Sequence, residues 1–196
     1  IPENIDLIIL TQGLSDHAHE ETLRLFDYKI PIISSYNASK IAKKVGFKDI
    51  NILKPGDEIN IMDIDIIATK GAPVPLHENG YIIKSEMISF YIEPHGFLDE
   101  NIKQQDIDIV ITPVINIGIP IIGSFIRGKD ATKELINVFN PKYIFASTVG
   151  GKIVFKGILG RLINYNESID KLNIKNSKFI NPVPGKNYVL ETKTKE

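Results

Sequence analysis

The residues that decide the fold are Ile5–Leu10, with the sequence IDLIIL, and Thr11–His17, with the sequence TQGLSDH. The first stretch is apolar and has the length of a buried strand. Ser15 or Asp16 in the second stretch can cap a helix that begins there. A strand, a loop and a helix in this order place the loop at the carboxyl end of the strand, where α/β folds build their sites. The sequence therefore predicts an α/β fold with a site in this loop.

Size and composition predict one globular domain over residues 1–190, followed by a disordered tail at 191–196. The chain has 196 residues, of which 43% are hydrophobic and 24% charged, so there is ample material for a core. No apolar run approaches the roughly 20 residues of a membrane-spanning helix. We therefore expect a protein of the cytoplasm, or of an organelle interior if a transit segment precedes Ile1.

Charge and cysteine content narrow the chemistry. The formal net charge is −1, which gives no general electrostatic reason to expect a nucleic-acid partner. The chain has no cysteine, so disulfides and thiolate metal sites are excluded. Any bound metal must rely on histidine, carboxylate or backbone oxygen ligands. The sequence does not indicate an oligomeric state.

The rest of the chain alternates between strand and helix patterns, which predicts a layered α/β sandwich. The period changes to two after the turn at Pro55-Gly56-Asp57, as expected for antiparallel strands with one wet face. The segment 150–163 is apolar but interrupted by glycines, and could form a hairpin or a lid. Further strands are predicted at 30–34, 50–53, 59–61, 64–66, 81–83, 88–92, 108–114 and 143–146, and further helices at 37–46 and 130–139.

The loop Thr11–His17 resembles the T-H-x-H-x-D-H signature of the metallo-β-lactamase superfamily, with Gln12 and Leu14 where the first two histidines stand. The order of elements over residues 1–147 is similar to the branch that contains ascorbate-6-phosphate lactonase and the phospholipase D acting on N-acyl phosphatidylethanolamine. The turn at 53–57 and the helix start at Asp130-Ala131 belong to this resemblance. It implies an αββα sandwich whose first strands would precede Ile1.

Carried over residue by residue, the resemblance implies an eroded dinuclear metal site. Asp16 and His17 are retained, and in the family these residues belong to the second metal. Lys70-Gly71-Ala72-Pro73 stands where the next histidine is expected. His95, in the turn Glu93-Pro94-His95-Gly96, corresponds to the bridging aspartate, and no histidine follows it. With the first-metal histidines also absent, the standard site cannot form.

The surviving side chains are sufficient for one metal ion. Asp16, His17 and His95 offer one carboxylate and two imidazoles, the count of a mononuclear catalytic zinc site with an open position. Iron or manganese would suit the same ligands, so the metal is not selected. Asp16 and His17 are then the catalytic candidates, and Glu20 and Glu93 are candidates to orient an imidazole from behind.

Other polar residues are candidates for substrate binding. Lys70 and Arg127 carry positive charge in loops that could face the cleft and receive a phosphate or carboxylate. Gln12, in the ligand loop, and His77, in a proline-rich loop, are candidates to contact a small-molecule or lipid-like substrate. Each of these side chains could equally be a solvated loop residue.

Two functions remain open from sequence. The first is a metal-dependent hydrolase that uses one divalent ion to attack an ester, a lactone or a phosphodiester. The second is a non-catalytic descendant of the fold that binds a ligand or partner and holds no metal. The missing histidines favour the second, and the retained Asp16, His17 and His95 favour the first.

Overall fold

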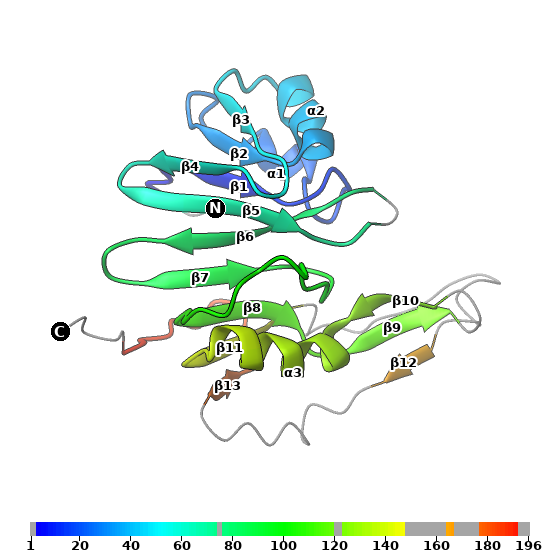
Figure 1. Ribbon diagram of the computed structural model, residues 1–196. Helices are drawn as coiled ribbons and strands as arrows, with labels where there is room; N and C mark the ends of the chain where they lie inside the picture. The colour runs from blue at the N-terminus through cyan, green and yellow to red at the C-terminus, as the bar shows by residue number, and fades with distance from the viewer. Residues whose placement is uncertain (1–2, 74–75, 120–122, 148–163, 167–176, 192–196) are drawn as a thin grey trace.

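The computed structural model describes residues 3–73, 76–119, 123–147, 164–166 and 177–191, which form four stacked layers. Helices α1 (Glu20–Leu23) and α2 (Tyr36–Val45) cover one face of a small sheet. The other face of that sheet packs on a larger sheet, and helix α3 (Gly128–Phe139) covers the far face of the larger one (Figure 1). The hairpin or lid expected at 150–163 lies outside the described residues.

The small sheet consists of three parallel strands in the order β1-β2-β3. Its central strand is buried on both faces because successive side chains point in opposite directions. Ile32 packs toward the two helices and Ile33 toward the larger sheet. Its strands are β1 (Ile8–Leu10), β2 (Ile32–Ser34) and β3 (Ile50–Ile52).

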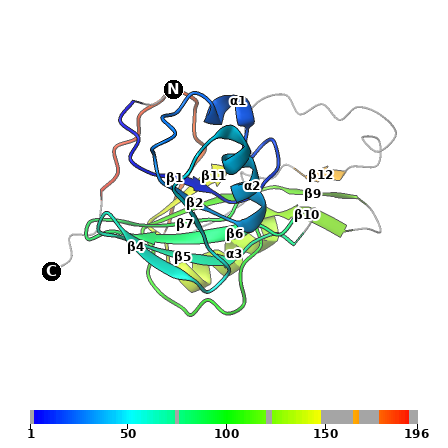
Figure 2. The same ribbon diagram turned by 90° about the horizontal axis from the view of Figure 1, so that it is seen from above.

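The larger sheet has seven strands in the order β13-β11-β8-β7-β6-β5-β4. The pairs from β4 to β7 are antiparallel and the pairs from β7 to β13 are parallel, as seen along the sheet in Figures 1 and 2. Its strands are β4 (Glu58–Ile61), β5 (Ile64–Lys70), β6 (Asn79–Lys84), β7 (Ser89–Ile92), β8 (Ile109–Pro113), β11 (Tyr143–Ser147) and β13 (Lys178–Ile180). A third, antiparallel sheet contains β9 (Asn116–Ile119), β10 (Gly123–Arg127) and β12 (Asn164–Asn166).

The predicted α/β class is confirmed, and the predicted strands and helices occur in the expected order, whereas β9, β10, β12 and β13 were not predicted. No helix within the described ranges is both long and apolar enough to cross a bilayer. Three predicted helix starts are wrong. Helix α2 is capped by Ser35 and begins at Tyr36, before the predicted residue 37. Helix α1 begins at Glu20 after a cap by His19, whose Nδ1 accepts from the Thr22 N–H, and not at Ser15 or Asp16. Helix α3 begins at Gly128, before the predicted Asp130.

A polar bridge fixes the end of β1 against β6. The hydroxyl of Tyr81, a fully buried residue, donates to the Leu10 carbonyl oxygen at 3.1 Å. Asn79 donates its side-chain amide to Tyr81 Oη at 3.2 Å and to the Leu53 carbonyl at 2.9 Å, and its backbone N–H to the Thr11 carbonyl at 3.0 Å. The loop that follows β1 is thereby held at the start of β6.

Replacing Tyr81 by Phe removes the hydroxyl that joins the two sheets while preserving the ring. We expect the free energy of unfolding to fall by about 1–2 kcal/mol, because the buried Leu10 carbonyl loses its donor from β6. Chemical denaturation followed by circular dichroism measures this change. Tyr28→Phe, at an exposed tyrosine, is the matched control and should change stability by less than about 0.5 kcal/mol. Equal effects in the two variants would show that the bridge contributes nothing specific.

Candidate metal centre

Three segments that are distant in sequence meet at one edge of the larger sheet. His17 lies in the loop between β1 and α1, Glu78 directly precedes β6, and His95 follows β7. Strands β6 and β7 are antiparallel, with Tyr81 opposite Ile92, so the start of one and the end of the other share this edge. The polar bridge to β1 brings the His17 loop to the same place.

Glu78 lies between the two imidazoles. Its Oε2 is 2.6 Å from His95 Nδ1 and its Oε1 is 3.4 Å from His17 Nδ1, while the two ring centroids are 4.9 Å apart. One ligand atom from each of the three residues lies within 4.8 Å of the others. Two imidazoles and one carboxylate form the donor set of mononuclear zinc and non-haem iron sites. These residues could therefore hold a metal ion.

The cluster is closed on the Glu78 side and opens toward Asp16. The Glu78 side chain has no exposed area, the His17 and His95 side chains are 10% and 14% exposed, and the Asp16 side chain is 73% exposed. Asp16 Oδ2 is 3.6 Å from His17 Nε2, and Thr11 Oγ1 is 3.1 Å from His17 Nδ1. The two nitrogens of His17 thus face different surroundings, one inward and one outward.

Glu93 shapes the turn that carries His95. Its Oε2 accepts the backbone N–H of His95 at 3.1 Å and of Phe97 at 2.6 Å. Gly96 has a φ of +77°, where side chains are strained, and a Cβ there would lie 2.8 Å from the Arg127 carbonyl carbon. The hydrogen bond from the His95 backbone N–H to Glu93 supports the predicted role of Glu93 in orienting an imidazole.

Burial shifts the pKa values of Glu93 and His17 toward their uncharged forms. Burial, and after it the neighbouring Glu78 carboxyl, raise the pKa of Glu93 well above the usual carboxyl range. Burial also lowers the pKa of His17, and it outweighs the opposite effects of Glu78 and Asp16. His17 is therefore held in the neutral form that metal binding requires.

Gln12 is fully buried and supports Glu78 from the β1 side. Its Nε2 donates to the Leu76 carbonyl at 2.7 Å, two residues before Glu78. Its Oε1 has no hydrogen-bond partner within the part of the chain that the structure describes. The side chain thus holds the segment that delivers Glu78, and its predicted contact with substrate stays a prediction.

Arg127 lies beside the His95 turn. Its backbone N–H donates to the His95 carbonyl at 2.8 Å, and its guanidinium carbon is 5.7 Å from the centre of the Phe97 ring. Lys70 ends β5, where its Nζ is 3.7 Å from Glu100 Oε1. The backbone of Arg127 therefore contacts the His95 turn while its charge lies near Phe97, whereas the charge of Lys70 faces an acidic neighbour.

The remaining predicted residues lie farther from the cluster. Glu20 pairs on the surface with Lys44 at 2.6 Å and Arg24 at 3.5 Å, and no hydrogen bond to an imidazole is found among the described residues. His77 is exposed next to Glu78. Glu78 was not among the predicted residues, because the resemblance directed attention to a histidine at 70–73. Its position directly before an antiparallel strand was the available signal.

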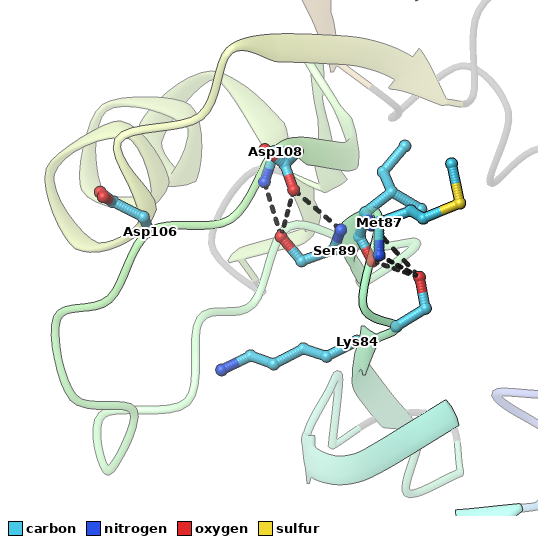
Figure 3. A pocket seen from close by; sticks show the side chains of 7 residues that line it. Lys84, Met87, Ser89, Asp106 and Asp108 are labelled. Atoms are coloured by element: carbon cyan, nitrogen blue, oxygen red, sulfur yellow. Dashed lines mark hydrogen bonds between the residues drawn. The ribbon is translucent and has the colours of Figure 1, made fainter. Parts of the chain in front are cut away.

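A separate pocket of about 280 Å³ lies at the other end of the β6–β7 hairpin (Figure 3). Asp108 Oδ2 accepts the Ser89 N–H at 2.9 Å and the Ser89 hydroxyl at 2.7 Å, and Lys84 Nζ donates to Gln105 Oε1 at 2.7 Å. These polar groups satisfy one another, so the pocket shows no group that requires a ligand.

The match to a family model over residues 1–147 shows that the chain belongs to the beta-lactamase superfamily. Among solved structures, a candidate metal-dependent hydrolase from Parabacteroides distasonis is 23% identical, with a TM-score of 0.58 over 75% of this chain and 67% of the other. A possible metal-dependent hydrolase from Veillonella parvula is 18% identical, with a TM-score of 0.56 over 73% and 62%. The metallo-beta-lactamase fold protein YhfI from Bacillus subtilis is 11% identical, with a TM-score of 0.58 over 78% and 67%.

At these identities the solved structures establish the metallo-β-lactamase fold alone. The chain spans between 62% and 67% of the length of those three proteins. A comparison with curated proteins finds no match.

The raised pKa of Glu93 predicts a specific pH dependence of stability in metal-free protein. The folded state holds the Glu93 proton more tightly than the unfolded state, so folded wild type loses stability as pH rises above the usual carboxyl pKa of 4.5. Glu93→Gln cannot titrate but can still accept the turn N–H groups. Between pH 4.5 and the raised pKa of Glu93, we expect the free energy of unfolding of wild type to fall by about 1.4 kcal/mol relative to this variant for each unit by which the pH rises.

Urea unfolding of both proteins between about pH 4.5 and 7, with chelator present, measures the difference. The surface variant Glu86→Gln serves as the control, and its curve should parallel that of wild type. Parallel curves for wild type and Glu93→Gln would contradict the assignment.

Proposed function

We propose that the protein is a hydrolase that uses one divalent metal ion held by His17 and His95, beside the buried carboxylate of Glu78, to cleave an ester, a lactone or a phosphodiester. The observation that carries this proposal is the meeting of two imidazoles and a buried carboxylate, with ligand atoms within 4.8 Å, at one edge of the sheet. The superfamily fold supports it, and zinc, iron and manganese all suit such donors. The substrate within these classes stays open.

Two features of the cluster fit a metal. The buried Glu78 Oε1 has no hydrogen-bond partner in the described part of the chain, and a cation held by the adjacent imidazoles would stabilise that carboxylate. His17 is neutral through burial, so that no proton has to leave before a ligand nitrogen becomes available. A divalent ion bound there would supply Lewis-acid activation of water at neutral pH.

The chain's own residues have distinct roles in this proposal. His17 and His95 would bind the metal ion, Glu93 fixes the His95 turn, and Gln12 holds the segment before Glu78. Arg127, beside the His95 turn, would bind the phosphate or carboxylate of an anionic small-molecule or lipid-like substrate, because guanidinium pairs with both groups through two parallel hydrogen bonds. Asp16, whose Oδ2 is 3.6 Å from His17 Nε2, would orient the group that is attacked.

A second candidate function is a non-catalytic ligand- or partner-binding protein without metal. The observation that favours it is the structural use of Gln12, which stands at a histidine position of the resembled signature and donates to a backbone carbonyl. Under this alternative, His17→Ala and His95→Ala would leave the function in cells unchanged while the protein stays folded. Loss of function in either folded variant would exclude it.

Metal uptake tests the proposed hydrolase directly. We expect wild type purified without chelator to bind close to one equivalent of zinc, iron or manganese, and His17→Ala and His95→Ala each to weaken zinc binding by about 100-fold or more, because each removes one of few ligands. Competition with a chromogenic chelator measures the affinity, and ester, lactone and phosphodiester substrates measure activity in parallel.

His19→Asn is the matched control. This histidine caps α1 through Thr22 rather than joining the cluster, and asparagine can take over the cap. Its zinc affinity should equal that of wild type. Uptake by wild type below about a tenth of an equivalent, with none on titration, would overturn the proposal.

A further inference from the structure

We infer that Glu78 is a positioning residue, hydrogen-bonded through Oε2 to His95 Nδ1 and facing His17 Nδ1 with Oε1, and that the metal is bound by the opposite nitrogens, Nε2, on the side of Asp16. The metal-binding half of this inference rests on the proposed function. The hydrogen-bonding half concerns the protein without metal and stands independently.

The distances define which nitrogen of each ring faces Glu78. His95 Nδ1 lies 2.6 Å from Oε2 and His17 Nδ1 lies 3.4 Å from Oε1, so each carboxylate oxygen faces a different ring. The two nitrogens of an imidazole lie on different edges of the ring. Both Nε2 atoms are therefore directed away from Glu78, and the ring centroids are 4.9 Å apart.

The cluster is buried on the Glu78 side and exposed to solvent on the Asp16 side. Glu78 is fully buried, the rings are 10% and 14% exposed, and Asp16 is 73% exposed with its Oδ2 3.6 Å from His17 Nε2. An ion or a substrate approaching from solvent meets the Nε2 side first. Metal-binding histidines commonly donate their other N–H to a carboxylate, which fixes the tautomer and the ring orientation. One carboxylate that serves two rings would orient both.

Thr11 offers the competing arrangement. Its hydroxyl, 3.1 Å from His17 Nδ1, could donate to that nitrogen and so place the proton of His17 on Nε2. Glu78 Oε1, which has no hydrogen-bond partner in the described residues, would then face a His17 nitrogen that carries no proton. An unpaired buried carboxylate oxygen is strongly disfavoured. The Nδ1–H form of His17, shared between Thr11 and Glu78, is the arrangement that satisfies all three groups.

The tautomers can be measured in the full-length, metal-free protein. Long-range ¹H–¹⁵N correlation spectra of ¹⁵N-labelled protein, at a pH where the rings are neutral, distinguish a protonated from an unprotonated ring nitrogen. Assignment uses the spectra of His17→Asn and His95→Asn. We expect the Nδ1–H form for both rings in wild type.

Glu78→Gln tests the cause. Glutamine has one acceptor oxygen and one donor nitrogen in place of two acceptors, so one of the two rings should change to the Nε2–H form. Glu86→Gln, at an exposed glutamate, should leave both rings as in wild type. The Nε2–H form in both wild-type rings, or no change of tautomer in folded Glu78→Gln, would overturn the inference.

Zinc titration of the same sample separates the inference from the proposed function. If both hold, the Nε2 resonances of His17 and His95 shift on binding while Nδ1 stays protonated, and Glu78→Gln binds zinc about 10- to 100-fold more weakly. Loss of the Nδ1 proton from either ring on binding would make Glu78 a ligand and contradict the inference alone. Failure to bind zinc, with the predicted tautomers intact, would contradict the proposed function alone.

Discussion

The structure depends on one constraint, the burial of the Glu78 carboxyl group at the edge where its sheets meet. A carboxylate with no exposed area requires donors, and two imidazoles approach its oxygens, while the Glu93 side chain is hydrogen-bonded to Glu78 as well. Space for it comes from a small neighbour, since a Cβ at Gly71 would lie 2.9 Å from Glu78 Cγ. The same holds for Glu93, whose Cγ would be 3.3 Å from a Cβ at Gly80. The cluster thus surrounds two buried carboxyl groups, those of Glu78 and Glu93.

This constraint explains how distant segments cooperate. The loop after β1 supplies His17 and is tied to β6 through Asn79 and Tyr81, while the turn after β7 supplies His95 and is tied to Glu93. Each tie is a hydrogen bond that involves the backbone of the loop or turn, so the positions of the rings follow from the fold itself. A site held in this way can bind a metal without large rearrangement, which is what the proposed hydrolase requires.

Much of the fold could be predicted from the sequence, because apolar periodicity and turn residues report local structure directly. The apolar run Ile5–Leu10 contains β1, and the turn residues around His95 indicated a tight turn after a strand. Contacts across the sheet could not be predicted in the same way. Glu78 lies 61 positions from His17, and nothing local to either residue shows that they meet. The start of α1 was also missed, because a histidine cap is less common than a serine or aspartate cap.

The most direct test of the account is anomalous diffraction at the zinc edge from crystals grown with zinc. The account predicts one strong peak at about 2.0–2.1 Å from an imidazole nitrogen of both His17 and His95. A well-ordered structure in which zinc binds elsewhere, or in which these two rings contact no ion at saturating zinc, would contradict it.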